Sequence, residues 1–140
     1  MEKRGFFWWL IFSILILWQL PQNLFALIML PFMGKLRIVA IRHYSICLEG
    51  SNMSGGISLG NFCFVSKSGA RRETTVMHEL DGHTVDSKIF GPLYLIIIGI
   101  PSMLNAMMFF TDCYYDFYTE KWANKHAGLT TNNCCQLIKL

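Results

Sequence analysis

Charged residues are absent from the first long stretch of the chain. Residues 5–34 form an uncharged run of 30 residues, and a membrane-spanning helix needs roughly 20. The pattern therefore predicts a membrane anchor over residues 1–34, with a kink or break at Pro21-Gln22-Asn23. A basic start before an apolar core is also typical of a cleaved signal peptide. No small-residue cleavage site follows, which favours a retained transmembrane helix.

Two later stretches alternate in the manner of β-strands. Residues 36–48 are rich in β-branched and aromatic side chains, and residues 57–65 alternate again. Residues 49–56 between them contain the Gly, Ser and Asn typical of turns. The pattern predicts a β-hairpin with a long connection.

A second uncharged stretch covers residues 89–111. Helices are predicted on both sides of it, from about Glu73 to Lys88 and from Asp112 to about His126, with Gly128 as a C-cap. Gly99-Ile100-Pro101-Ser102 predicts a break in the middle of the apolar stretch.

Composition supports a membrane location for the whole chain. Of its 140 residues, 53% are hydrophobic and 15% are charged, whereas soluble domains carry about 25% charged residues. The net charge of +3 is too small to indicate a nucleic-acid partner, and a lipid bilayer accounts for it equally well.

Five cysteines without a Cys-x-x-Cys pair indicate neither a disulfide framework nor a zinc ribbon. Cys47 and Cys63 can face each other across the predicted hairpin, but free buried thiols are the favoured interpretation. The adjacent Cys134 and Cys135 suggest no role.

The residues that carry chemistry gather in His78-Glu79-Leu80-Asp81-Gly82-His83. A hydrolytic zinc site uses three protein ligands and leaves one position for water. In the usual His-Glu-x-x-His motif the two rings lie about 40° apart around the helix. The five-residue spacing here places them about 140° apart in a regular helix. A zinc site therefore requires a local widening such as a π-bulge, which Gly82 would ease.

These six residues resemble the widened His-Glu-x-x-x-His motif of the dipeptidyl-peptidase III zinc enzymes. Together with Glu120-Lys121-Trp122-Ala123-Asn124 they also resemble the gluzincin metallopeptidases, in which a Glu-x-x-x-Asp helix supplies the third ligand. Residues 55–128 are similar to a group of small bacterial membrane proteins that carry His-Glu-x-Gly-His-Thr and Glu-Lys-Trp-Ala-Asp.

The resemblance implies a role for each residue of the site. His78, His83 and Glu120 would bind Zn²⁺, and Glu79 would act as the general base. Asn124 replaces the Asp of the family, so it would orient a ligand imidazole without adding negative charge. Asp112 and Asp116 remain as alternative ligands, although solvated charges at a membrane boundary are commoner.

The resemblance also implies an α+β fold. Residues 35–128 would form a minimal zincin-like domain of a β-hairpin, an active-site helix and a Glu-bearing helix. The edge strand that pairs with substrate would lie within residues 56–65. Residues 129–140 would be a C-terminal tail. His43 and His126 are interpreted as surface or interfacial histidines rather than ligands.

Topology sets a condition on this site. His83 precedes the apolar segment 89–111 and Glu120 follows it. A straight span of about 30 Å would place the two ligands on opposite sides of a bilayer. The segment must therefore fold back, and residues 99–102 are the predicted turn.

The sequence thus predicts a membrane-embedded zinc metallopeptidase that cleaves peptides or membrane proteins, located in the bacterial inner (cytoplasmic) membrane. The alternative is a catalytically inactive zincin-like membrane protein with a partner-binding or regulatory role. In a third interpretation, the chain is a small membrane scaffold and the motif arises by chance.

Overall fold

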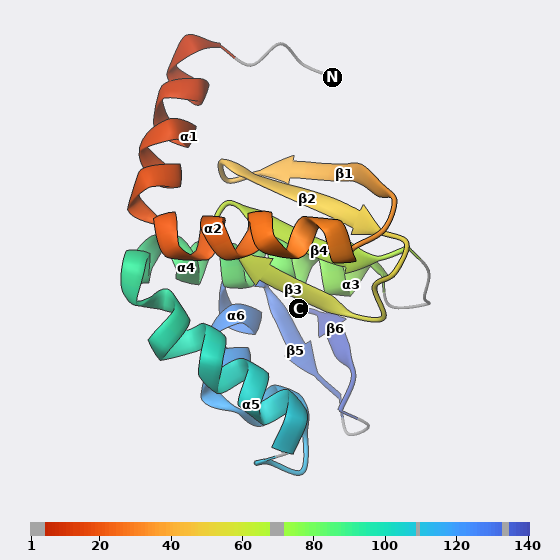
Figure 1. Cartoon of the computed structure of the whole chain (residues 1–140). Helices are drawn as coiled ribbons and strands as arrows, with labels where there is room; N and C mark the ends of the chain where they lie inside the picture. Colours follow the sequence, from red (N-terminus) through yellow and green to blue (C-terminus); the bar gives the residue numbers. More distant parts are fainter. Residues whose placement is uncertain (1–4, 68–71, 109, 133–134) are drawn as a thin grey trace.

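The computed structural model describes residues 5–67, 72–108, 110–132 and 135–140, which form a mixed α+β fold (Figure 1). The α-helices and strands, in chain order, are α1 (Phe6–Trp18), α2 (Leu20–Met29), β1 (Leu36–Arg42), β2 (Ser45–Gly50), β3 (Gly56–Leu59), β4 (Phe62–Ser66), α3 (Arg72–Val76), α4 (Thr84–Phe90), α5 (Ile100–Met108), α6 (Tyr118–Ala127), β5 (Leu129–Thr131) and β6 (Leu137–Lys139). Between them lie 3-10 helices at Leu30–Phe32, Gly91–Leu93 and Tyr114–Asp116, and π-helices at Met77–His83 and Leu95–Gly99.

The described strands β1 to β4 form one sheet in the order β1-β2-β4-β3. The prediction of a single hairpin was wrong, because each predicted strand is itself a hairpin. β1 pairs with β2 and β3 pairs with β4, both antiparallel, and β2 and β4 lie parallel in the centre. The first turn is formed by His43 and Tyr44, with φ of 51° and 56°. Both values are those of a type I′ turn. The sequence did not indicate such a turn, because His and Tyr are not among the residues that favour it.

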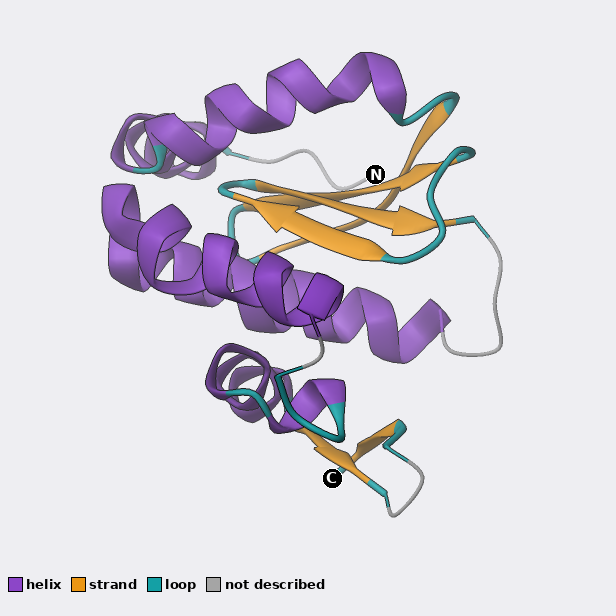
Figure 2. Cartoon of the chain, turned by 60° about the horizontal axis from the view of Figure 1, so that its bottom comes forward, coloured by secondary structure: helices purple, strands orange, loops and turns teal. Residues whose placement is uncertain are grey.

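Both faces of the sheet are covered by helices (Figure 2). Along β4, Phe62 and Phe64 pack with Ala26 of α2, whereas Cys63 and Val65 pack with Leu80 of the motif helix, the helical stretch over residues 72–90 that carries His78 and His83. This alternation follows from the two-residue period of a strand. The apolar sequence of β4 therefore reflects burial on both faces, and it fixes the motif helix against the sheet.

α1 and α2 meet at a sharp elbow. The break falls at Gln19, close to the predicted position, and the two helices are bent by 91°. Buried amides satisfy backbone carbonyls of α1, since Gln19 Nε2 donates to Leu15 O and Asn23 Nδ2 donates to Ile16 O. Among the described residues, no single helix combines the length and the apolar character that a bilayer crossing requires. α1 and residues 20–32 meet that requirement only as a bent pair.

The motif helix runs from Arg72 to Phe90, as predicted, and the apolar segment follows it. The predicted break at residues 99–102 was wrong, because the chain is helical from Leu95 through Met108. Pro101 lies in the first turn of α5, directly after a π-helix. Inside a continuous helix a proline removes one backbone hydrogen bond, and a neighbouring π-helical turn can provide other partners for the freed groups. The chain turns back after this helix rather than within it, so that Tyr118 Oη at the start of α6 donates to Ile97 O.

The C-terminal residues, for which no structure was predicted, form the antiparallel β5–β6 hairpin. α6 begins at Tyr118 rather than near Asp112 and ends at Gly128, which has a left-handed φ of 65° as the C-cap prediction requires. A disulfide joins Cys113 to Cys135, and the sequence did not predict it.

The other cysteines in the described part of the chain are free. Cys47 and Cys63 are buried thiols, as favoured, and they lie opposite each other on the parallel strands β2 and β4.

Removal of the disulfide by Cys113→Ser together with Cys135→Ser should lower the free energy of unfolding by about 3 kcal/mol. The bridge joins positions 22 residues apart, so it restricts the unfolded chain. Thermal unfolding of the metal-free protein measures the effect. A phosphine reductant should bring the wild type to the melting temperature of the variant and leave the variant unchanged. Equal stability of the two oxidised proteins would contradict the prediction.

Candidate metal centre

Three donor atoms from distant parts of the chain converge at one point. His78 Nε2 lies 2.9 Å and His83 Nε2 lies 3.3 Å from the same oxygen, Glu120 Oε2. All three donors lie within 4.8 Å of one another, and all three side chains are buried. Donors about 2.0–2.1 Å from a tetrahedral zinc ion lie about 3.3 Å apart. The spacings to Glu120 are therefore already close to those that a zinc ion requires.

The π-helix Met77–His83 brings the two imidazoles together. Its hydrogen bonds run between residues five apart, so residues five apart lie on one face. The ring centroids of His78 and His83 are 4.8 Å apart. The local widening that the motif spacing required is confirmed.

Gly82 has a packing role that differs from the predicted one. A Cβ at this position would lie 2.6 Å from the carbonyl oxygen of Ala123 in α6. Glycine therefore allows the backbone of the π-helix to approach α6 closely. This approach places Glu120 of α6 beside the two imidazoles.

Asp81, the additional residue of the motif, points away from the metal centre. Its carboxylate lies 2.7 Å from Arg42 Nη1 and 3.3 Å from His43 Nε2, at the β1–β2 turn. The additional residue therefore ties the motif helix to the sheet. His43 is half exposed and pairs with Asp81, in agreement with its interpretation as a surface histidine.

Glu120 is held at both of its carboxylate oxygens. Oε2 faces the two imidazoles, and Oε1 accepts hydrogen bonds from Ser102 Oγ of α5 and from Thr119 Oγ1. Burial by itself would raise the pKa of Glu120, but His78 and His83 hold it well below its ordinary value. The carboxylate is therefore ionised, as a metal ligand must be.

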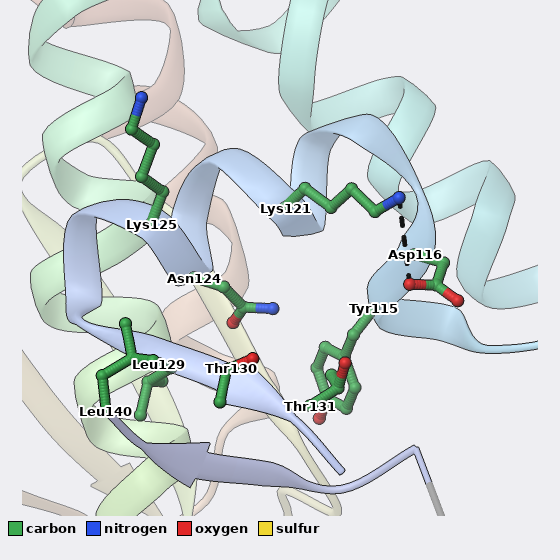
Figure 3. A pocket seen from close by; sticks show the side chains of 9 residues that line it. All are labelled: Tyr115, Asp116, Lys121, Asn124, Lys125, Leu129, Thr130, Thr131 and Leu140. Carbon is green, nitrogen blue, oxygen red and sulfur yellow. Dashed lines mark ion pairs between the residues drawn. The ribbon is translucent and has the colours of Figure 1, made fainter. Parts of the chain in front are cut away.

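Asn124 orients His78 as predicted, because its Oδ1 lies 2.8 Å from His78 Nδ1. The ring of Tyr115 packs edge-on against His78 on the same side, with centroids 5.5 Å apart. Asn124 and Tyr115 also line a pocket of about 320 Å³ beside β5, which Figure 3 shows. This pocket borders the groups that orient His78, and the three metal donors do not line it.

Glu79 lies under β3, at an edge of the described sheet. Ser58 Oγ donates to Glu79 Oε2 over 2.6 Å and also contacts the Glu79 carbonyl. A Cβ at Gly56 would lie 2.5 Å from Glu79 Oε1, so the carboxylate packs against the β3 backbone. The expected edge strand therefore corresponds to β3, whereas β4 is an interior strand.

Asp86 is a buried carboxylate that the sequence analysis did not identify. Its Oδ2 lies 3.6 Å from His83 Nδ1, and its Oδ1 lies 2.8 Å from Nδ1 of His126, whose side chain is 33% exposed. Burial would lower the pKa of His83, but Asp86 and Glu120 raise it to about 10. The spacing of three residues after His83 on one helix is the signal that could have found Asp86.

The other contributing groups carried no such signal. Ser58, Ser102 and Thr119 reach the site only through tertiary packing. The alternative ligands are not part of the cluster: Asp116 is exposed, 3.9 Å from Lys121 Nζ, and Asp112 is exposed.

Comparison with known proteins yields no match among family models, curated proteins or solved structures.

Gly82→Ala should destabilise the protein by about 1–3 kcal/mol, because the added methyl group collides with the Ala123 backbone. Helix propensity alone predicts the opposite sign, a gain of about 1 kcal/mol. Thermal unfolding distinguishes the two. Gly55→Ala is the control, since its Cβ would meet nothing within 4 Å. A Gly82→Ala protein as stable as the wild type would show that the approach of the two helices is not tight.

Proposed function

We propose that this protein is a zinc-dependent metallopeptidase that acts at or in a membrane. The observation that carries the proposal is the convergence of His78 Nε2, His83 Nε2 and Glu120 Oε2. Two imidazoles and one carboxylate form the donor set of catalytic zinc sites, in which water takes the fourth position. Zn²⁺ is the cofactor that fits this set.

The fold elements around the site support a zincin-like arrangement. An edge strand, a helix that carries His78 and His83, and a second helix that carries Glu120 lie side by side. In this proposal β3 is the strand along which an extended peptide substrate would bind.

The chemistry follows from the groups on the chain. When bound, zinc supplies a Lewis acid that lowers the pKa of water to near 7. Glu79 follows His78 in the π-helix, and both side chains are buried. Ser58 Oγ donates to Glu79 Oε2, which would leave Oε1 to take the proton from water and to return it to the leaving amine. Asn124 fixes the ring of His78, and Ser102 with Thr119 fixes Glu120.

Metal content and activity of matched variants test this proposal. The wild type should hold close to one zinc per chain, and His78→Gln or Glu120→Gln should lose it. Glu79→Gln should keep the metal and lose at least 100-fold in hydrolysis, because it removes only the general base. A mixture of internally quenched peptides in detergent micelles serves as substrate, and Asp116→Asn is the control for an exposed acid.

Two other outcomes would lead to different conclusions about the function. A wild type that binds no zinc overturns the proposal. Zinc binding with no hydrolysis that depends on Glu79 would instead indicate the inactive zincin-like protein with a binding or regulatory role.

The membrane part of the proposal rests on exposed apolar side chains. They lie on α1, α2 and the helix from Leu95 to Met108 in numbers unusual for a soluble surface. Examples are Phe7, Leu17, Phe25, Ile28, Ile96 and Met107. The Cys113–Cys135 disulfide favours a site on the oxidising side of such a membrane.

Flotation with neutral phosphatidylcholine vesicles tests the membrane contact. The wild type should float with the vesicles, and Leu17→Asp combined with Ile96→Asp should strongly reduce flotation, since each Asp costs up to about 3 kcal/mol in hydrocarbon. Lys125→Asp on the exposed face of α6 should have no effect. A double variant that floats as well as the wild type would contradict the prediction.

A further inference from the structure

Asp86 is the strongest candidate for an additional functional group, because its carboxylate is fully buried. Within the described chain neither of its oxygens has a hydrogen-bond partner, and His83 Nδ1 has none either. Burying an ionised carboxylate without hydrogen bonds is costly. A residue kept under such conditions needs a reason, and its neighbours are the imidazoles of His83 and His126.

The two nitrogens of His83 face two different carboxylates. Nε2 lies 3.3 Å from Glu120 Oε2, whereas Nδ1 lies 3.6 Å from Asp86 Oδ2. In zinc proteins a ligating imidazole commonly donates its second N–H to a carboxylate or carbonyl, which fixes the tautomer and makes the ligand more basic. Asp86 is placed to accept that N–H once His83 moves slightly toward it.

The two imidazoles of the site are oriented by different groups. His78 Nδ1 faces the neutral amide of Asn124 at 2.8 Å. His83 Nδ1 faces a carboxylate. The negative charge that Asn124 does not provide to His78 is thus present next to His83.

We propose that Asp86 is the positioning residue for His83 and that its carboxylate supplies the negative charge beyond the donor set that strong zinc binding needs. His126 of α6 holds Asp86 Oδ1 from the opposite side. α6 then contributes three residues to the site: Glu120 as a ligand, Asn124 beside His78 and His126 beside Asp86. This inference rests on the zinc site proposed above.

Zinc affinity of two variants tests the proposal, with competition against a chromophoric chelator as the measurement and zinc alone as the ligand. Asp86→Asn should raise the dissociation constant by about 10- to 100-fold. Asp86→Asn combined with Asn124→Asp should recover most of that loss, because a carboxylate then faces the other imidazole. Asp116→Asn, which changes an exposed acid, should bind zinc like the wild type.

A purely structural role for Asp86 makes one different prediction. Under either role the metal-free Asp86→Asn protein should lose stability, because Asp86 lies 2.8 Å from His126 Nδ1 and 3.6 Å from His83 Nδ1, and removing one partner of a buried ion pair is destabilising. Only the positioning role predicts that zinc affinity recovers in Asp86→Asn combined with Asn124→Asp while the stability of the metal-free protein does not. A loss of stability of the metal-free variant that parallels the loss of affinity, with no recovery by Asn124→Asp, overturns the proposal.

The test also separates this inference from the function on which it rests. A wild type that binds no zinc overturns both. A wild type that binds zinc no more tightly than Asp86→Asn overturns the role of Asp86 alone and leaves the zinc site intact.

Discussion

A single buried carboxylate holds the site together. Glu120 is fully buried, and burial of an ionised group is tolerable only where polar partners replace the lost water. His78 and His83 of the motif helix contact Glu120 Oε2, and Ser102 and Thr119 donate hydrogen bonds to Oε1. The two histidines reach Glu120 because the helix that carries them is a π-helix. Ser102 reaches it because the chain turns back after α5 and brings α6 against that helix.

The π-helix is supported from both sides. On the side of the sheet, Asp81 pairs with Arg42 and His43 at a turn whose residues have positive φ. Such a conformation costs non-glycine residues of order 1–3 kcal/mol each and persists only where the surroundings determine it. On the opposite side, Gly82 permits the approach of α6. Contacts with the sheet and with α6 therefore stabilise the π-helical conformation of the motif.

The apolar segments also make hydrogen bonds to the helices that carry the candidate site. Gln22 at the elbow of α1 and α2 donates to Gly91 O, and Trp18 Nε1 donates to Lys88 O at the end of the motif helix. From the other segment, Ser102 bonds Glu120, and Asn105 bonds the Tyr114 carbonyl ahead of α6. Hydrogen bonds therefore connect both apolar segments to the helices that carry the His78, His83 and Glu120 cluster.

The sequence by itself determined the local features of this protein. The approximate extent of the motif helix, the end of α6 before Gly128 and the widened turn between His78 and His83 were predicted from the sequence, because each depends on neighbours along the chain. It did not determine that each predicted strand turns back at residues such as His43 and Tyr44, where alternation continues through the turn. Nor did it show where the chain turns back after the apolar segment. Gly99 and Pro101 suggested a break there, but the helix continues through them from a π-helix into α5. The roles of Ser58, Ser102 and Gly82 and the pairing of Cys113 with Cys135 were decided by tertiary structure, because they arise from contacts between segments far apart in the chain.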